Sequence, residues 1–151
     1  MDGRIISSAK MDVRLRYGQS VKRQTLDLAE EIQKHGRDNL YLRIALEVHG
    51  RRVSEETVFL TPPRFLALPK GKVSANVRQL TSTQALITFR SEVFQHRFAF
   101  DLPGLEHQSS DNYFELYPRE QKDVIVELLE PVTKSALAKR LHFQSLADTY
   151  A

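Results

Sequence analysis

Residues 40–49 read LYLRIALEVH, and this stretch decides the fold class. Its even positions are apolar, whereas most of its odd positions are polar. Successive side chains of a β-strand point to opposite faces, so a period of two predicts a strand with one buried and one solvated face. Gly50 permits a turn, and residues 53–60, VSEETVFL, are typical of the return strand of a hairpin. The apolar even positions are Leu40, Leu42, Ile44, Leu46 and Val48.

The same period of two recurs along the rest of the chain. It predicts strands at MDVRLRY (11–17), VSANVRQ (73–79), QALITFRS (84–91), RFAFDL (97–102) and DVIVELLE (123–130), and a weaker one at VKRQTLDL (21–28). DVIVELLE carries apolar residues at both odd and even positions, which predicts a strand covered on both faces.

Two short segments have helical features. In DLAEEIQKHG (27–36), Asp27 is placed to cap a helical turn and Gly36 to end it. After Pro131, Thr133 is placed to cap a second helix, on which Leu137 and Leu141 share one face. The sequence therefore predicts one short helix between strands and another near the C-terminus, followed by an extended end.

Short strands at regular spacing, with no strand–helix–strand alternation, predict an all-β chain of antiparallel immunoglobulin-like β-sandwich modules with a short C-terminal helix or tail. Pro62, Pro63 and Pro69 mark the best boundary, because proline cannot continue a central strand. We expect a partial sandwich domain over 1–64, a Pro-rich packed linker over 65–71 and a complete C-terminal domain over 72–151. The first domain is short for a sandwich, so we expect it to lack its opening strands and to expose an unpaired edge.

Composition narrows the function classes. The 151 residues contain no cysteine, which excludes disulfides, thiolate zinc sites and a cysteine nucleophile. No apolar run approaches the roughly 18 residues of a membrane span, and the N-terminus MDGRIISSAK has no signal-peptide core. The net charge of +3 comes from dispersed basic residues, which indicates solvated strand faces instead of a nucleic-acid surface. We expect neither a membrane nor a nucleic acid as a partner.

Motifs for chemistry are missing. The five histidines have no ligand spacing, and no phosphate-binding glycine loop or Gly-x-Ser-x-Gly elbow occurs. The neighbouring carboxylates Glu30-Glu31 and Glu55-Glu56 are interpreted as solvated structural residues. With no tryptophan, a sugar-binding platform has only tyrosines to use, and Tyr17, Tyr41 and Tyr113 fit packing roles in strands or turns. The sequence therefore predicts no catalytic, cofactor-binding or metal-ligating residue.

Residues 109–118, SSDNYFELYP, set a turn-forming pair against two aromatic rings. Asp and Asn favour turns because their side chains bond the nearby backbone. Tyr113 and Phe114 are then expected to re-enter a strand with one ring in the core and one ring outward. This pattern predicts a sandwich corner, and its structural signature comprises Ser110, Asp111, Asn112, Tyr113, Phe114, Leu116 and Pro118.

Residues 110–120 resemble the S-D-N-x-F-x-L-x-P-G-E signature in the last Ig-like domain of β-mannosidases of glycoside hydrolase family 2, whose layout the related exo-β-glucosaminidases share. Three further segments resemble segments of the same family and occur in the same order along the chain. They are residues 45–73, 84–102 and 141–150 (LHFQSLADTY). The resemblance covers 40–151 strongly and 1–39 loosely. Arg119 stands where the family has glycine, which predicts a type I turn instead of a positive-φ form. Arg64 replaces a frequent lysine.

The resemblance implies a parent enzyme that removes terminal β-mannose residues with retention of configuration. Such a reaction uses two carboxyl groups about 5 Å apart, which this family carries on a TIM barrel of about 250 residues. The chain is too short to contain that barrel, and no catalytic residue is carried over to it.

The sequence therefore predicts the non-catalytic C-terminal β-sandwich region of a retaining, exo-acting, β-mannosidase-like glycoside hydrolase. On its own the chain would not be an enzyme and would need no cofactor. Its partners would be the catalytic barrel and the other domains of the parent, and its compartment, periplasmic, secreted or cytoplasmic, would be the parent's. Two alternatives stay open: a stand-alone glycan-binding or adhesion module, and a β-rich scaffold that self-associates through an exposed edge strand.

Overall fold

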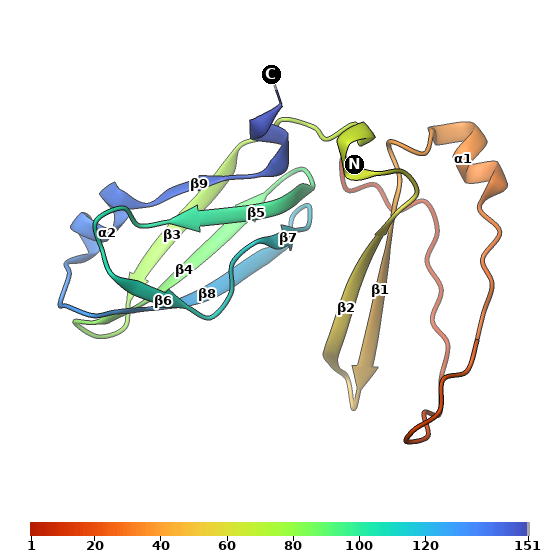
Figure 1. Cartoon of the computed structure of the whole chain (residues 1–151), viewed down its shortest axis with the longest axis horizontal. Helices are drawn as coiled ribbons and strands as arrows, with labels where there is room; N and C mark the ends of the chain where they lie inside the picture. Colours follow the sequence, from red (N-terminus) through yellow and green to blue (C-terminus); the bar gives the residue numbers. More distant parts are fainter. Residues whose placement is uncertain (151) are drawn as a thin grey trace. The chain divides into compact units, whose positions relative to one another are not determined.

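The computed structural model describes residues 1–150 and divides the chain into two compact units. Unit 1 comprises Met1–Gly3 together with the chain from Ala67 onward, and unit 2 comprises Arg4–Leu66. Each unit has its own strands and one α-helix (Figure 1).

Unit 1 consists of two antiparallel sheets. The first sheet has four strands in the order β3-β4-β8-β6, and the second has three in the order β7-β5-β9. Every strand pairing in the two sheets is antiparallel, which confirms the predicted all-β fold class. The strands are β3 (Val73–Gln79), β4 (Gln84–Ser91), β5 (Gln95–Asp101), β6 (His107–Ser109), β7 (Phe114–Leu116), β8 (Gln121–Leu128) and β9 (His142–Gln144).

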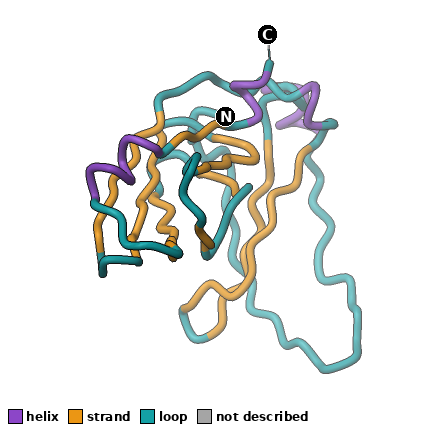
Figure 2. The backbone as a smooth tube through the Cα atoms, turned by 60° about the vertical axis from the view of Figure 1, so that its left-hand side comes forward, coloured by secondary structure: helices purple, strands orange, loops and turns teal. Residues whose placement is uncertain are grey.

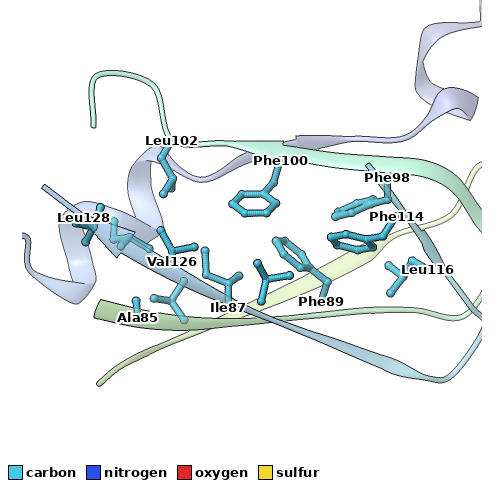
Figure 3. Close-up of a cluster of buried hydrophobic side chains, with 13 residues drawn as sticks. Ala85, Ile87, Phe89, Phe98, Phe100, Leu102, Phe114, Leu116, Val126 and Leu128 are labelled. Carbon is cyan, nitrogen blue, oxygen red and sulfur yellow. The ribbon is translucent and has the colours of Figure 1, made fainter. Parts of the chain in front are cut away.

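The core of unit 1 lies between the two sheets. Ile87 of β4 is paired with Val124 of β8, and both side chains are fully buried. Alternation along β5 brings Phe98 and Phe100 to face the β4 side of the core, where Figure 3 shows their rings above that of Phe89. Burial of this apolar surface, worth about 25 cal/mol per Å², is the main stabilisation of unit 1. The core comprises Val77, Ala85, Ile87, Phe89, Phe98, Phe100, Leu102, Phe114, Leu116, Val124, Val126, Leu128 and Leu137.

The outer face of β8 is exposed, contrary to the sequence prediction. Val124, Val126 and Leu128 point into the core as expected. Ile125 points outward instead and is exposed, and Leu129, just after the strand, is 71% exposed. The prediction of a strand covered on both faces is therefore wrong, because a two-layered sandwich covers only one face of each sheet.

Strand β5 contains an irregularity that the alternating pattern did not reveal. Its register against β7 shifts between Gln95 and Phe98, and Arg97 has φ = 49°. A β-bulge inserts an extra residue and re-aims the neighbouring side chains. As a result Gln95 and His96, although consecutive, are both buried.

The C-terminal tail packs onto unit 1. Helix α2 (Lys134–Arg140) begins where predicted, and the hydroxyl of its N-cap Thr133 accepts a hydrogen bond from the Ala136 N–H at 3.3 Å. Beyond it, the extended end is strand β9, which pairs with β5, followed by the 3₁₀ turn η2 (Leu146–Thr149). The Ser145 N–H donates to the Asp148 carboxylate at 2.7 Å and fixes the start of η2.

Unit 2 contains the predicted hairpin and helix. Strand β1 (Tyr41–Val48) pairs with β2 (Arg51–Phe59) through a two-residue turn. Both turn residues have positive φ, 50° at His49 and 74° at Gly50, the signs that a type I′ turn requires. Helix α1 (Ala29–His35) begins beside Asp27, whose carboxylate accepts the Ala29 N–H at 3.0 Å, and ends at Gly36. A 3₁₀ turn, η1 (Pro63–Phe65), follows the hairpin.

The two strands predicted before α1 are absent. Residues 4–28 form neither helix nor strand and are drawn as loop in Figure 2. Both MDVRLRY and VKRQTLDL alternate as strands do, yet a strand is stable only when its backbone groups pair with a neighbour. Among the described residues, no strand pairs with either segment, so the predictions for 11–17 and 21–28 are wrong.

One face of the hairpin is uncovered. Register places Leu42, Ile44, Leu46 and Val48 of β1 on one side, with Val58, Glu56 and Ser54 of β2 opposite the first three; we call the four β1 residues and Val58 the open face. Ile44 is 55% exposed, and Val48 and Val58 are exposed as well. The expectation that this face is buried is therefore wrong for this chain. Of the described residues of unit 2, only Leu66, its last, is a buried apolar residue.

Candidate functional site

Ser110 opens the signature corner and belongs to the first sheet. Its main-chain N–H donates to the Ile125 carbonyl oxygen at 2.8 Å. Its hydroxyl oxygen accepts the Ile125 N–H at 3.0 Å. Ser110 thus prolongs the β6–β8 ladder by one residue, and its side chain satisfies a donor that would otherwise face the end of β6.

Asn112, two residues later, belongs to the second sheet. Its Nδ2 donates to the Phe100 carbonyl oxygen at 2.9 Å, and its Oδ1 accepts the Phe100 N–H at 3.1 Å. The same Oδ1 accepts the Tyr113 N–H at 3.0 Å. The side-chain amide of Asn112 therefore makes the two hydrogen bonds that a neighbouring strand would make to the main chain of β5 at Phe100. Residues 110 and 112 tie the corner to both layers of the sandwich.

Asp111 lies between these two residues in the sequence and forms an ion pair with a lysine side chain. Its carboxylate is 2.5 Å from the Lys122 ammonium on β8. The same ammonium lies 5.0 Å from the centroid of the Phe114 ring. A lysine held between a carboxylate and a ring face is favourable on both sides, by about 0.5–1 kcal/mol for the cation–π contact at an exposed site. This arrangement closes the edge of the core beside the corner.

The rings of Tyr113 and Phe114 part in opposite directions. Phe114 is buried, with its centroid 5.5 Å from that of Phe98 and 6.0 Å from that of Phe89 (Figure 3). Tyr113 is 73% exposed and has φ = 60°, so it belongs to the turn, and β7 begins one residue later. Leu116 repeats the inward direction of Phe114 and is buried as well.

Arg119, which follows Pro118, adopts the backbone that its predicted turn type excluded. Its φ is 64°, in the left-handed region that favours glycine. Its N–H donates to the Ser91 carbonyl oxygen at 2.7 Å, and its own carbonyl oxygen accepts from the Arg90 guanidinium at 3.2 Å. The type I prediction is wrong because these bonds hold the strained backbone in place.

A histidine–carboxylate pair lies on the same sheet. His96 of β5 is buried, and its Nδ1 lies 2.8 and 3.0 Å from the two carboxylate oxygens of Glu115 on β7. An ionised carboxylate only accepts, so Nδ1 carries the proton. The imidazole also stacks on Phe94, with centroids 6.4 Å apart. The pair has the geometry of a structural cross-strand contact.

The neighbouring glutamates make no acid/base pair with each other. Glu55 is opposite Ala45 and Glu56 is opposite Ile44, so the two carboxylates point to opposite faces of β2. Glu55 is bound by the guanidinium groups of Arg43 and Arg52. Glu30 and Glu31 lie in the first turn of α1, where acidic residues favour the helix dipole.

Among residues 1–150, no three His, Asp or Glu side chains cluster as metal ligands would. None of the helices in the described part of the chain has the length and apolar character that a membrane crossing demands.

The remaining candidates for ligand contact are exposed side chains. Tyr17 is fully exposed, so the packing roles predicted for Tyr17 and Tyr113 are wrong, while Tyr41 is half-buried. In unit 2 an open depression is lined by Arg14, Arg16, Gln19, Val21 and Arg23. Guanidinium groups donate hydrogen bonds but neither accept nor release protons near neutral pH, so this depression offers no acid/base chemistry.

Hydrogen bonds from Ser110 and Asn112 thus hold the signature corner to both sheets. The sequence pattern located the corner and its buried residues. It missed the pairing of Asn112 with Phe100 and the strained backbone at Tyr113 and Arg119. An Asn in a turn was the only available signal, since its partner Phe100 is 12 residues away on β5.

Comparison with known proteins adds the family. A family of mannosidase Ig-fold domains matches residues 68–149, and the mannosidase Ig/CBM-like domain family matches residues 1–64. A search of the curated proteins returns no match. Among solved structures, a β-D-mannosidase from Dictyoglomus thermophilum is similar in fold, with a TM-score of 0.63 over 73% of this chain and 17% sequence identity. This chain spans 13% of the length of that protein.

Proposed function

The chain belongs to the family of mannosidase Ig-fold domains, and we propose that it is the non-catalytic C-terminal β-sandwich region of a β-mannosidase-like glycoside hydrolase. Its task is to support a catalytic TIM barrel that the parent enzyme supplies. The parent is a retaining, exo-acting glycosidase. The barrel and the parent's other domains are the partners of this chain.

The observation that carries this proposal is the open face. A strand with an apolar face is stable when another layer covers that face. Unit 2 leaves Ile44, Val48 and Val58 in water and buries only Leu66 among its apolar residues. Residues 1–64 are thus best understood as the rear part of a penultimate domain whose remaining strands belong to the parent. Residues 65–71 then form the linker, and residues 72–151 form the last domain.

The signature corner supports the same reading, because it serves the integrity of the sandwich. Ser110 bonds to β8 of one sheet and Asn112 to β5 of the other. Phe114 and Leu116 fill the space between them. We propose that this signature keeps the last domain rigid, so that it can hold its neighbours in place. The retaining reaction itself needs two carboxyl groups about 5 Å apart on one site, and those of Glu55 and Glu56 diverge.

The proposal is tested with the pure chain and with the parent. The chain alone should release no phenol from an aryl β-mannoside above the blank. In the parent, deletion of this region should lower the melting temperature and the soluble yield of the barrel. Turnover by the pure chain that a point change within it abolishes would refute the proposal, and so would a barrel whose stability is unaffected by the deletion.

A second candidate is a glycan-binding module, favoured by one observation: the Tyr113 ring projects from the corner with 73% of its surface exposed. Exposed flat rings are the usual contacts of sugar faces, and CH groups of a pyranose pack on them. Calorimetric titration with mannan oligosaccharides decides between the two. Heat of binding that Tyr113→Ala removes would favour this candidate, whereas no heat favours the support role.

The two-stranded sheet of unit 2 favours self-association as a third candidate. No third strand pairs with β1 or β2 among the described residues, and unpaired strand edges recruit other chains. Sedimentation at rising protein concentration tests this. The bulge at Leu46/Glu47 and the charged side chains of β2 oppose edge pairing. If they block it, the weight-average mass should stay that of a monomer at every concentration.

A further inference from the structure

The long loop that precedes α1 in unit 2 carries a run of positive charge (Figure 1). Between Asp12 and Asp27 the chain has no acidic residue. The basic residues of this stretch, all of them exposed, are Arg14, Arg16, Lys22 and Arg23. Alternating charges would lie along a solvated face if the stretch were a strand, but residues 4–28 form no strand. A solvated strand face therefore does not account for their arrangement.

A tight turn folds this stretch back on itself. The Gln19 N–H donates to the Arg16 carbonyl oxygen at 3.3 Å, and Gly18, the third residue of the turn, has φ = 71°. Positive φ at this position of a β-turn is the conformation that glycine favours. Beyond the turn, the Arg23 guanidinium donates to the Arg14 carbonyl oxygen at 2.6 Å. This bond ties the two arms of the loop together and keeps the three arginines near one another.

The two arms surround the open depression described above, which has a volume of about 330 Å³. Its lining comprises three arginines, one glutamine and one valine, and includes no carboxylate. Among residues 1–150, none of the three arginines forms an ion pair with an Asp or Glu side chain. Guanidinium groups gathered around one space repel one another, and an anion placed between them replaces that repulsion with attraction.

We propose that this depression binds a tetrahedral oxyanion, a phosphate or sulfate group that is either free or esterified to a sugar-sized molecule. A guanidinium presents a fork of N–H donors that fits two oxygens of such a group. Three guanidinium groups suit a ligand with four oxygens and more than one negative charge better than a flat carboxylate with one charge. The Gln19 side chain adds a neutral donor. We call Arg14, Arg16, Gln19 and Arg23 the arginine site.

The size of the depression and the chemistry of its lining fit binding and not catalysis. Pockets for small molecules have volumes of about 300–1,000 Å³, so the depression leaves room for the body that carries the oxyanion. The arginine site lies wholly within unit 2 and is formed by one local loop. It does not depend on the support role proposed above, and it holds whatever reaction the parent performs.

Arg16→Gln and Lys22→Gln are the matched pair for the first test. Each removes one positive charge from the same loop, but only Arg16 lines the depression. Titration of the full chain with inorganic phosphate at constant ionic strength, followed by the NMR signals of residues 14–23, should show saturable binding. Arg16→Gln should weaken it at least about tenfold, as expected for loss of a charged hydrogen bond. Lys22→Gln should weaken it by less than about twofold, because salt screens a charge outside the site.

Gly18→Val tests the geometry of the site at constant charge. A β-branched residue resists the φ of 71° at this position. A Cβ at Gly18 meets nothing within 4 Å, so the substitution acts through the backbone of the turn alone. The affinity for phosphate should fall at least about threefold, in line with the usual cost of such backbone strain. Unaltered affinity would overturn the arginine site, because binding would then not depend on how the turn places the guanidinium groups.

The source of the oxyanion is identified by titration with mannose 6-phosphate. Tighter binding than that of inorganic phosphate assigns an esterified ligand, and equal binding assigns the free anion; uncharged mannose should not bind. Equal losses in Arg16→Gln and Lys22→Gln would overturn the site, because they would show diffuse attraction by the whole loop. Absence of saturation at millimolar phosphate would overturn it as well, and so would binding confined to a polyanion such as a DNA oligonucleotide.

Discussion

Asn112 bonds both main-chain polar groups of Phe100 with a single amide, at 3.1 Å to the N–H and 2.9 Å to the carbonyl oxygen. The partner Phe100 is a core residue of β5 and pairs with Phe143 of β9 in the register of the sheet. Asn112, two residues before β7 begins, therefore occupies the place of a strand residue beside β5. It gives the irregular corner the hydrogen bonds that a regular ladder would supply.

Replacement of Asn112 should destabilise unit 1. Asn112→Ala leaves two half-buried main-chain groups of Phe100 without these partners, and we expect a loss of about 2 kcal/mol in the free energy of unfolding. For a domain of this size that corresponds to a fall of about 10 °C in melting temperature. Urea and thermal unfolding followed by circular dichroism measure the change.

Gln108→Ala is the matched control for that change. Gln108 lies on β6 with an exposed side chain, and its substitution should alter stability by less than about 0.5 kcal/mol. If both variants unfold alike, the amide of Asn112 is not a strand substitute.

Phe89 should be the most sensitive aromatic position. Its ring lies 5.0 Å from Phe98, 5.3 Å from Phe100 and 6.0 Å from Phe114. Phe89→Ala empties the centre of this cluster, and we expect a loss of about 3–5 kcal/mol. Leu129→Ala, at a 71% exposed position, should change stability by less than about 0.5 kcal/mol. Comparable losses at the two positions would contradict the observed core.

Arg119 should tolerate, and benefit from, glycine. Its φ of 64° strains any residue with a Cβ, and relief of that strain outweighs the weak exposed contact of its guanidinium with Glu92. We expect Arg119→Gly to raise the free energy of unfolding by about 0.5–1 kcal/mol. Arg78→Gly, within β3, should lower it by about the same amount, because glycine weakens a regular strand. The two denaturation midpoints should move in opposite directions; a shift of the same sign at both positions would show that the backbone at Arg119 is unstrained.

The exposure of the open face is tested by making the same substitution, isoleucine to threonine, at an exposed and at a buried position. Ile44 is 55% exposed and Ile87 is fully buried. Ile44→Thr should leave stability within about 0.5 kcal/mol of the unaltered chain and reduce binding of the dye ANS, because an exposed apolar group is lost. Ile87→Thr should cost at least about 2 kcal/mol, since its hydroxyl has no partner in the core. A large loss at Ile44 would mean that the open face is covered in solution.

Local patterns determined much of unit 1 and part of unit 2. The period of two located β3, β4, β5 and β8, and Thr133 located the start of α2, whereas the N-cap of α1 is Leu28, one residue after the predicted Asp27. Turn chemistry located the β1–β2 hairpin and the corner at 110–118. These features follow from bonds and side-chain directions within a few residues, which a sequence displays directly.

The errors arose where a remote partner decides the outcome. MDVRLRY alternates as well as β3 does, yet it forms no strand because no neighbouring strand pairs with it among the described residues. Ile125 has the same apolar character as Val124, but only one of them faces the second sheet. Alternation states which residues share a face, and it does not state whether anything lies against that face.

The sequence by itself thus determined that this chain is built of antiparallel strands with a corner at Ser110–Pro118. Only the tertiary structure decided that Asn112 acts on Phe100, that Arg119 is held in a left-handed backbone and that Ile44, Val48 and Val58 of the open face are exposed. Each of these depends on contacts between residues far apart along the chain, and such contacts form only when whole sheets have packed. A local pattern carries no information on the backbone of a distant strand, which is the physical reason for the division.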